Sequence, residues 1–424
     1  MIVGKNKFLA AIVALMLLAA ACSSSKSSSA KPPAGSAGAS GASSGNGKTV
    51  TIGVLTDLTG AAASSDKSTI PGVQAGIAWA KDQGYTIKYV AADTATSPTT
   101  ALTAAETLVA QDHVLAVIMD TGVGFAAAPY LNREHVPVIG LAADGPEWAT
   151  DTNMFAVTGV IKENLVSTMY GNFFKMQGVT NLASFGYGGD PATSEFAKTV
   201  ADSGKAAGIK IGYENAQVPL TSTNVEPLAL AMASDKVDGI YGAVASGFFL
   251  NLVSSLRQLS PGPKVFLENT GYGQDLLQSG PGAVQNAQGT YVVLSGEPLE
   301  LNTSATQQFQ KYLQEVGVTG DPGYQTYTGY GAIGMLVQGL KAAGSNPTQA
   351  SLTTGLSTIH NWDFMGLWGG RTLDINNRAD TQNIGGPGNC GWFVKVSGQD
   401  FQLVSGAEPL CGPTIPGISE TPSA

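Results

Sequence analysis

Small hydroxyl residues follow two strand-like runs in the first third of this chain, and they could hold a small ligand by hydrogen bonds. Ser64 and Ser65 come after the first run, in a loop of small residues. Thr121 and Gly122 come after a later run and open a predicted helix, whose free N–H groups can bind an anion such as a carboxylate. These residue types indicate binding rather than bond making.

Further candidates combine aromatic rings with polar groups after other strand-like runs. One loop contains Ala143, Asp144 and Trp148. The candidates later in the chain follow strands or open helices, and they are Tyr187, Ser246, Phe248, Thr270 and Tyr272. Such side chains suit a mostly apolar pocket with a few oriented hydrogen bonds.

Some of these residues also have a purely structural interpretation. Thr121 would then cap a helix, Trp148 and Phe248 would belong to the core, and Tyr187 would lie on an exposed loop. The sequence leaves both interpretations open.

Residues 122–127 also fit the dinucleotide fingerprint G-x-G-x-x-A, with Asp144 about 20 residues further on. A nicotinamide oxidoreductase is the corresponding alternative. Two points count against the oxidoreductase. The fingerprint opens the third strand–helix unit rather than the first, and its glycines would serve a tight turn with or without a bound dinucleotide. No G-x-S-x-G motif follows a predicted strand, the chain has no H-E-x-x-H motif and no P-loop, and its three histidines lie in unrelated segments. We therefore expect no enzyme and no cofactor.

Short β-branched runs alternate with longer helical patterns along the chain. Strands are predicted at residues 50–55, 86–91, 114–119, 136–140, 181–186, 209–214, 237–244, 264–268 and 291–294. Helices are predicted at residues 72–81, 100–111, 161–176, 195–207, 248–259, 305–316 and 324–343, with a hairpin at 392–404. Strands that alternate with helices imply parallel pairing with helices on both faces, so the predicted fold class is α/β.

Length and charge limit the possible functions. The chain has 424 residues, and the part after residue 48 is long enough for two lobes. Lys and Arg number 22 against 31 for Asp and Glu, a formal charge of −9. This balance argues against nucleic acid as a partner, because nucleic-acid binding needs clustered cations.

The first residues have the parts of an export signal. Lys5 and Lys7 precede an apolar run, and small residues precede Cys22. This segment resembles a bacterial lipoprotein signal, in which the cysteine is lipidated after the cut, although Ala19 stands where leucine is commonest. The alternative of an uncleaved membrane helix is disfavoured, because the apolar stretch is shorter than the roughly 20 residues that a span needs.

Residues 22–48 are almost entirely small and polar, which predicts a flexible tether. Near the other end of the chain lie Cys390 and Cys411. In the oxidising compartment that export implies, a disulfide between them is the natural pairing. A metal site is the rival interpretation, but the spacing of cysteines and histidines matches no ligand pattern.

The order of elements and several segments resemble the type I periplasmic binding proteins, specifically the leucine/isoleucine/valine-binding branch of ABC-transporter receptors. The segments that carry the resemblance are TIGVLTDLTG at 51–60, AVIMDTGVG at 116–124, VPVIGLAADGPEWA at 136–149, VDGIYGAVASG at 237–247, KVFLENTGYG at 264–273 and FMGLWGG at 364–370. No single segment is diagnostic; their order is the specific feature.

The resemblance implies two doubly wound parallel-sheet lobes joined by three chain crossings, which would fall near Thr158, Ser295 and Gly366. The N-terminal lobe would then comprise residues 49–157 and 295–365, and the C-terminal lobe residues 158–294 and 366–413, with a tail at 414–424. A ligand would lie in the cleft, where open parallel sheets bind ligands at the carboxyl ends of their strands.

The resemblance also implies a function and leaves the ligand open. Family members that bind amino acids hold the ammonium with an acidic side chain, but Thr270 occupies that position here, with Glu268 two residues earlier. Asp144 or Glu268 could compensate, so amino acids, amides, urea-like molecules and small organic acids remain candidates. The implied protein is a lipid-anchored, monomeric receptor on the outer face of the cytoplasmic membrane that delivers its ligand to an ABC permease. A sensor or envelope interaction protein with the same fold is the alternative.

Overall fold

The computed structural model describes residues 49–142, 145–160, 162, 165–259, 262–404 and 406–419. The predicted signal at 1–21, the predicted tether at 22–48 and the lipidation site Cys22 lie outside the described residues. Ala143 and Asp144 lie outside them too. Within the described part, no helix combines the length and the apolar character that crossing a membrane requires.

The first sheet is parallel and has five strands in the order β2-β1-β3-β4-β5. Its strands are β1 (Thr49–Thr56), β2 (Thr86–Asp93), β3 (Val117–Asp120), β4 (Val138–Gly140) and β5 (Met154–Ala156). The central strands are buried β-branched and aliphatic runs, as expected for a sheet covered on both faces. The strand order reverses at β1, so the loops after β1 and β3 diverge there and leave a crevice.

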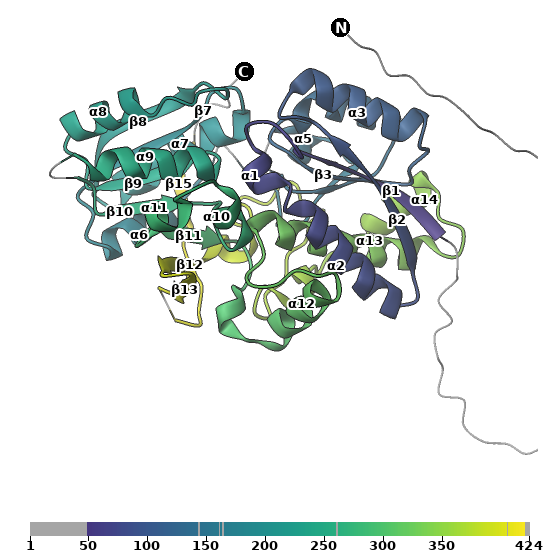
Figure 1. The fold of residues 1–424 in the computed structure, drawn as a ribbon. Helices are drawn as coiled ribbons and strands as arrows, with labels where there is room; N and C mark the ends of the chain where they lie inside the picture. Colours follow the sequence, from purple (N-terminus) through teal and green to yellow (C-terminus); the bar gives the residue numbers. More distant parts are fainter. Residues whose placement is uncertain are drawn as a thin grey trace, which may run out of the picture. The chain divides into compact units, whose positions relative to one another are not determined.

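Helices from two distant parts of the chain cover this sheet. They are α1 (Ala63–Asp66), α2 (Thr69–Asp82), α3 (Pro98–Ala110), α4 (Ala128–Arg133), α5 (Glu147–Thr150), α12 (Ser304–Glu315), α13 (Tyr324–Ala343) and α14 (Gln349–Leu356). Figure 1 shows α13, from late in the chain, beside α2. Gly72 permits this close packing, because a Cβ there would lie 2.1 Å from the Thr326 carbonyl oxygen.

The second sheet has eight strands and is mixed, with the main order β13-β12-β11-β10-β9-β7-β8 and β14 beside β12. Its strands are β7 (Asn181–Tyr187), β8 (Lys210–Val218), β9 (Gly239–Ala243), β10 (Val265–Glu268), β11 (Tyr291–Leu294), β12 (Cys390–Ser397), β13 (Asp400–Leu403) and β14 (Leu410–Cys411). The strands from β8 to β11 are parallel, and β12, β13 and β14 add an antiparallel edge.

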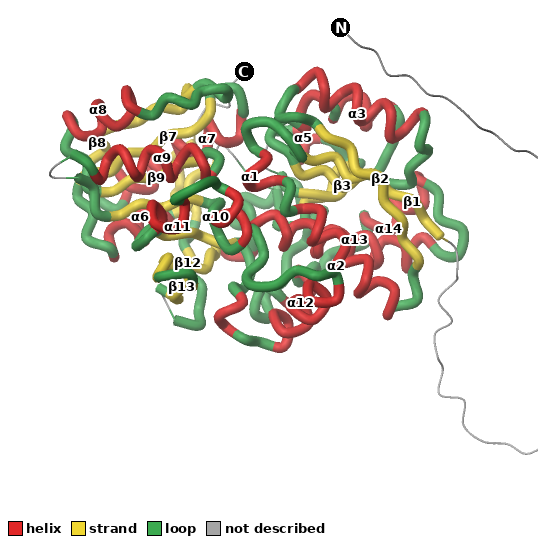
Figure 2. Tube along the Cα trace, viewed as in Figure 1, coloured by secondary structure: helices red, strands yellow, loops and turns green. Residues whose placement is uncertain are grey.

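Helices flank the second sheet as well, as Figure 2 shows. They are α6 (Met169–Met176), α7 (Pro191–Ala206), α8 (Glu226–Ser234), α9 (Ser246–Arg257), α10 (Gln274–Gln278) and α11 (Ala283–Ala287). The predicted α/β class and the predicted hairpin of β12 and β13 are confirmed. The division into two lobes with crossings near Thr158, Ser295 and Gly366 stays a prediction.

One predicted helix is wrong in its first half. The helix expected over 161–176 begins only at Met169, and Leu165–Ser167 forms strand β6 instead. Strand β6 pairs antiparallel with β15 (Thr414–Ser419), which lies in the segment expected to be a tail. A backbone hydrogen bond from Thr168 N–H to the Pro413 carbonyl continues this contact. Pairing with a distant segment thus overrides the local apolar period.

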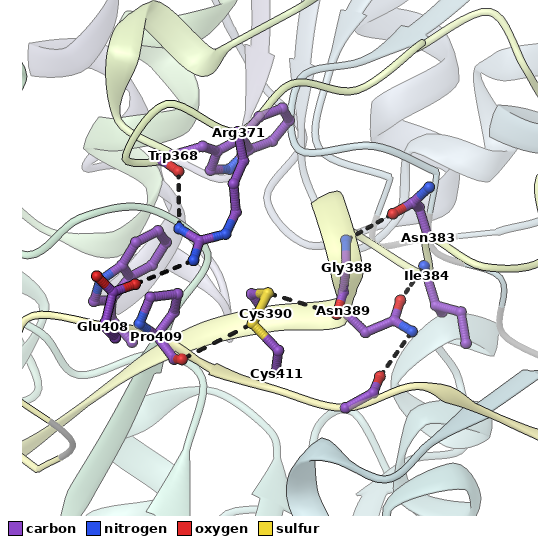
Figure 3. Close-up of a disulfide and its surroundings, with 12 residues drawn as sticks. Trp368, Arg371, Asn383, Ile384, Gly388, Asn389, Cys390, Glu408, Pro409 and Cys411 are labelled. Carbon is purple, nitrogen blue, oxygen red and sulfur yellow. Dashed lines mark hydrogen bonds and ion pairs between the residues drawn. A yellow bond between two sulfur atoms is a disulfide. The ribbon is translucent and has the colours of Figure 1, made fainter.

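Cys390 and Cys411 form the predicted disulfide, with the two sulfurs 1.94 Å apart (Figure 3). The two residues are also directly opposite each other in the pairing of β12 with β14. Beside the disulfide, Arg371 and Glu408 form an ion pair at 3.2 Å. The disulfide closes a loop between chain positions 21 residues apart and so fastens the last strands to the second sheet.

Replacing both cysteines by serine should lower the free energy of unfolding by about 3 kcal/mol, because a loop of this length gains that much entropy in the unfolded chain. Urea unfolding of the Cys390→Ser/Cys411→Ser variant measures the loss. Each single variant should lose a similar amount, since either one removes the cross-link. A double variant as stable as the parent would show that strand pairing alone holds the C-terminal segment.

Candidate functional site

A cavity of about 230 Å³ lies between the loops at the carboxyl ends of both sheets. From the side of the first sheet, it is lined by residues such as Ser65, Asp66, Asp120, Thr121 and Gly122. From the side of the second sheet, the lining includes Tyr170, Tyr187, Asp190, Phe196, Asn269 and Thr270. The volume suits a small molecule rather than a polymer segment.

Asp57, at the end of β1, organises the loops of the first sheet. Its fully buried carboxylate accepts hydrogen bonds from the hydroxyls of Thr94 and Thr121 and from the backbone N–H of Thr96. The bond from Thr121 Oγ1 to Asp57 Oδ2 is 2.9 Å long. Thr121 therefore joins the loops after β1 and β3, and its proton is already donated within the protein.

Asp66 and Asp120 bring two more carboxyl groups to the cavity. Asp66 is 7% exposed and Asp120 is 1% exposed. Burial, followed by the repulsion of neighbouring carboxyls, raises the pKa of Asp66 well above its usual range. Burial likewise raises the pKa of Asp120, against the hydrogen bond that Thr69 Oγ1 donates to Asp120 Oδ2 at 2.7 Å. Burial therefore favours the neutral form of both carboxyls in the unliganded protein.

Two buried polar atoms on this side have no protein partner among the described residues. They are Oδ1 of Asp120 and Oγ of Ser65, and both residues line the cavity. Ser65 is 2% exposed. A buried polar atom that stays unpaired costs free energy, so such atoms on a cavity wall indicate where a ligand would complete the hydrogen bonding.

The second sheet contributes polar groups from the ends of β7 and β10. Asp190 caps helix α7, and its Oδ1 accepts from the Thr193 N–H at 3.2 Å. Tyr187 is largely buried, and its hydroxyl oxygen accepts from the Ala245 N–H at 3.4 Å. Burial raises the pKa of Tyr187 to about 12, so its hydroxyl keeps its proton and can donate. The Asn269 side chain lies beside the hydroxyls of Tyr170 and Tyr241, and its buried Oδ1 has no hydrogen-bond partner within the standard distance among the described residues.

Aromatic rings form one wall of the cavity. The rings of Tyr170 and Phe196 meet edge to face with centroids 5.4 Å apart, and both residues line the cavity. Tyr241 stands behind them, 5.4 Å from Tyr170 and 5.9 Å from Phe196. An apolar ligand body would pack against this wall.

The two sides of the cavity touch each other at its edge. A Cβ on Gly122 would lie 3.2 Å from Asp190 Oδ2, and helix α1 contacts α9 and α10. At the base, Asp275 of α10 accepts a 2.6 Å hydrogen bond from the N–H of Tyr324, the first residue of α13. Residues from the two sides of the cavity therefore approach each other closely around it.

Five of the residues predicted to bind ligand line the cavity: Ser65, Thr121, Gly122, Tyr187 and Thr270. Five others do not line it: Ser64, Trp148, Ser246, Phe248 and Tyr272. Ser64 and Phe248 lie close by, since Phe248 packs against Tyr187 with ring centroids 6.1 Å apart and Ser64 precedes Ser65. Ser246 is fully buried beside Glu268. Ala143 and Asp144 lie outside the described residues.

Trp148 and Tyr272 belong to the core. Trp148 is 1% exposed in the core beneath the first sheet. Tyr272 is completely buried, its ring lies 4.6 Å from that of Phe401, and its hydroxyl donates to Glu300 at 2.9 Å. Their large rings fill space between elements, which the sequence pattern cannot distinguish from a place on a cavity wall.

The fingerprint of residues 122–127 does not open a long helix. Strand β3 leads into the short 3₁₀ segment Gly124–Ala126, and the six-residue helix α4 follows. A dinucleotide fold places the pyrophosphate on the N-terminus of a long crossover helix, which this segment does not supply. Among the described residues, no group of His, Cys, Asp and Glu is arranged to hold a metal ion.

Sequence reasoning missed the acidic residues of the site, Asp66, Asp120 and Asp190, as well as Tyr170 and Asn269. Asp120 had a usable signal, because it is the last residue of β3 and directly precedes the predicted Thr121. Tyr170 had no such signal, because the sequence pattern placed it in the middle of a helix over 161–176, whereas helix α6 begins at Met169.

Two sheets with flanking helices and a small cavity between their strand ends are the arrangement of a protein that binds a small ligand between two α/β units. The comparison with protein families agrees: residues 49–400 match the family described as periplasmic binding protein. The chain belongs to this family, which confirms the resemblance seen in the sequence. Among curated protein sequences, no match is found.

Solved structures share the fold. A leucine binding protein, LivK, from Thermotoga maritima is 16% identical, with a TM-score of 0.68 over 84% of this chain and 97% of that chain. A solute binding protein from R. palustris in complex with 4-hydroxybenzoate is 16% identical, with a TM-score of 0.69 over 87% and 97%. LivJ from Streptococcus pneumoniae in complex with isoleucine is 13% identical, with a TM-score of 0.68 over 84% and 99%.

Proposed function

We propose that the protein is an extracytoplasmic solute receptor of an ABC importer, which captures one small polar molecule in the cavity between its sheets and delivers it to a membrane permease. The observation that carries the proposal is the 230 Å³ cavity with polar and aromatic groups from both sheets. Membership of the periplasmic binding protein family supports it. So does the shared fold with receptors for leucine, isoleucine and 4-hydroxybenzoate.

In this proposal, Ser65, Thr121, Gly122, Tyr187 and Thr270 contact the ligand. Closure is a hinge motion at the crossings near Thr158, Ser295 and Gly366, and ligand shifts the balance between open and closed forms by its greater affinity for the closed one. Thr158 and Ser295 both line the cavity, so the hinge segments would sense its occupant directly.

The receptor is held at the outer face of the cytoplasmic membrane by a lipid on Cys22 and acts as a monomer. The composition of the first residues supports this part of the proposal. A Cys22→Ala variant should be recovered in the soluble fraction of cells, whereas the parent stays with the membrane. Equal fractionation of both proteins would contradict the anchor.

A thermal-shift screen of the purified protein tests the function. Amino acids, amides, aromatic carboxylates and organic amines are each added at millimolar concentration. A ligand present at 100 times its Kd should stabilise the folded state by about 2.7 kcal/mol, which is readily measured as a raised Tm. Calorimetry on each hit should give one site per chain. A screen in which no small molecule raises the Tm would contradict a receptor function.

A further inference from the structure

The cavity wall is acidic and has no basic group among its described residues. Asp66, Asp120 and Asp190 line it, and Lys, Arg and His are absent from the lining. Asp57, Glu268 and Asp275 add further buried carboxyls around it, each at most 1% exposed. No basic group on the described wall could pair with an anionic ligand, whereas a cation could pair with a carboxyl that ionises as the cation binds.

Helix N-termini are the usual alternative sites for an anion, and the long helices near the cavity already bind carboxyl groups of the chain itself. Asp190 caps α7. Asp275 accepts from the first N–H of α13. Glu268 lies beside Ser246, the first residue of α9. Carboxyl groups of the chain therefore occupy the space at these helix ends where an anionic ligand would otherwise bind.

The unpaired polar atoms on the wall are hydrogen-bond acceptors. In its ionised form the Asp120 carboxylate has no proton to donate, so its Oδ1 acts as an acceptor. The amide oxygen Oδ1 of Asn269 is an acceptor as well. Ser65 Oγ has two lone pairs free for a donor. Asp120 and Ser65 come from the side of the first sheet, and Asn269 comes from the side of the second sheet. A group with several N–H donors would satisfy acceptors on both sides at once.

We propose that the ligand is a small organic cation, an ammonium or amidinium group on an apolar body, whose N–H groups donate to Asp120, Ser65 and Asn269. The apolar body packs against the rings of Tyr170 and Phe196, which also attract a cation through their faces. This inference rests on the proposed receptor function and names its ligand class.

Binding of such a cation is coupled to proton release. The carboxyls that face Asp120 and Asp66 are those of Asp57, just after β1, and Asp275 on α10. The Tyr324 hydroxyl of α13 also faces Asp120 and Asp275, and Lys67 faces Asp275. Burial raises the pKa of Asp120 in the unliganded protein, which favours its protonated form there. A bound cation favours the ionised form and expels that proton. Affinity for the cation therefore rises with pH until Asp120 is ionised without ligand.

Ligands of equal shape and different charge test the proposal on the parent protein. Benzamidinium, benzamide and benzoate form one set, and 3-methylbutylammonium, 3-methylbutanol and 3-methylbutanoate form the other. Calorimetry at pH 7.5 should give at least tenfold tighter binding for the cation of a set than for its neutral and anionic members. Titrations in phosphate and in Tris should show proton release with the cation and none with the neutral ligand.

The Asp120→Asn variant should lose the preference for the cation by tenfold or more, while affinity for the neutral member stays unchanged. The matched control is Asp112→Asn, which removes an exposed carboxylate from the surface. Ser65→Ala gives a second measurement, with a severalfold loss of cation affinity, if Asp120→Asn does not fold. Tighter binding of benzoate or 3-methylbutanoate overturns the cation inference and leaves the receptor function standing. Binding of none of the six compounds, when another molecule raises the Tm, also overturns the inference alone.

Discussion

Replacing Tyr272 by alanine should lower the free energy of unfolding by about 4 kcal/mol and leave ligand affinity unchanged in the protein that still folds. The ring is fully buried against Phe401 and Tyr327, so its removal leaves a cavity in the core. Truncation of a large buried aromatic ring costs about 3 to 5 kcal/mol. Urea unfolding and a ligand titration of the same preparation measure the two effects separately.

Tyr272→Phe is the matched control, because it keeps the ring and removes only the hydroxyl. That hydroxyl donates to Glu300 Oε2 at 2.9 Å and accepts from the Leu299 N–H at 3.2 Å. Its loss should cost about 1 to 2 kcal/mol. If Tyr272→Ala were as stable as the parent and bound ligand poorly, Tyr272 would be a ligand contact, as the sequence suggested, and the placement in the core would be wrong.

Replacing Gly122 by leucine should weaken ligand binding at least 100-fold, equivalent to about 2.7 kcal/mol, with little loss of stability. A Cβ added at this position would lie 3.2 Å from Asp190 Oδ2, which comes from the other side of the cavity. The remaining atoms of leucine would keep the two sides apart. The backbone at Gly122 is outside the left-handed region, so a side chain introduces no backbone strain.

Gly247→Ala is the control for Gly122→Leu. Gly247 is the second residue of α9, and a Cβ there would make ordinary contacts, 3.5 Å from the Ser279 carbonyl oxygen and 4.0 Å from Ser64 Oγ. Affinity should change less than twofold. Calorimetry measures both variants, and thermal unfolding without ligand checks that each is folded. Tight binding by Gly122→Leu would show that the contact between Gly122 and Asp190 is not part of the ligand-bound form.

Much of the fold could be predicted because its signals are local. A few neighbouring residues are enough to predict a strand from a buried β-branched run such as β1, or a helix from a long apolar segment such as α13. The start of α6 could not be predicted in this way. Its preceding residues pair with β15, about 250 positions later, and a local period contains no information about so distant a partner.

The site could be predicted only in outline. The rule that ligands bind at the carboxyl ends of strands led to Thr121 and Tyr187, which line the cavity. The rule does not say which side chain of a loop faces the cavity. Trp148 and Tyr272 therefore entered the prediction although they fill the core. The sequence pattern does not show whether a given acidic residue is exposed, and only the fold shows that Asp66 and Asp120 are buried.

A crystal structure of the protein with a molecule that raises its Tm tests the central claim most directly. The account predicts one ligand per chain in the cavity, in contact with residues of both sheets, including Thr121 from the first and Thr270 from the second. A ligand bound elsewhere on the chain, with the cavity filled only by water, would contradict it.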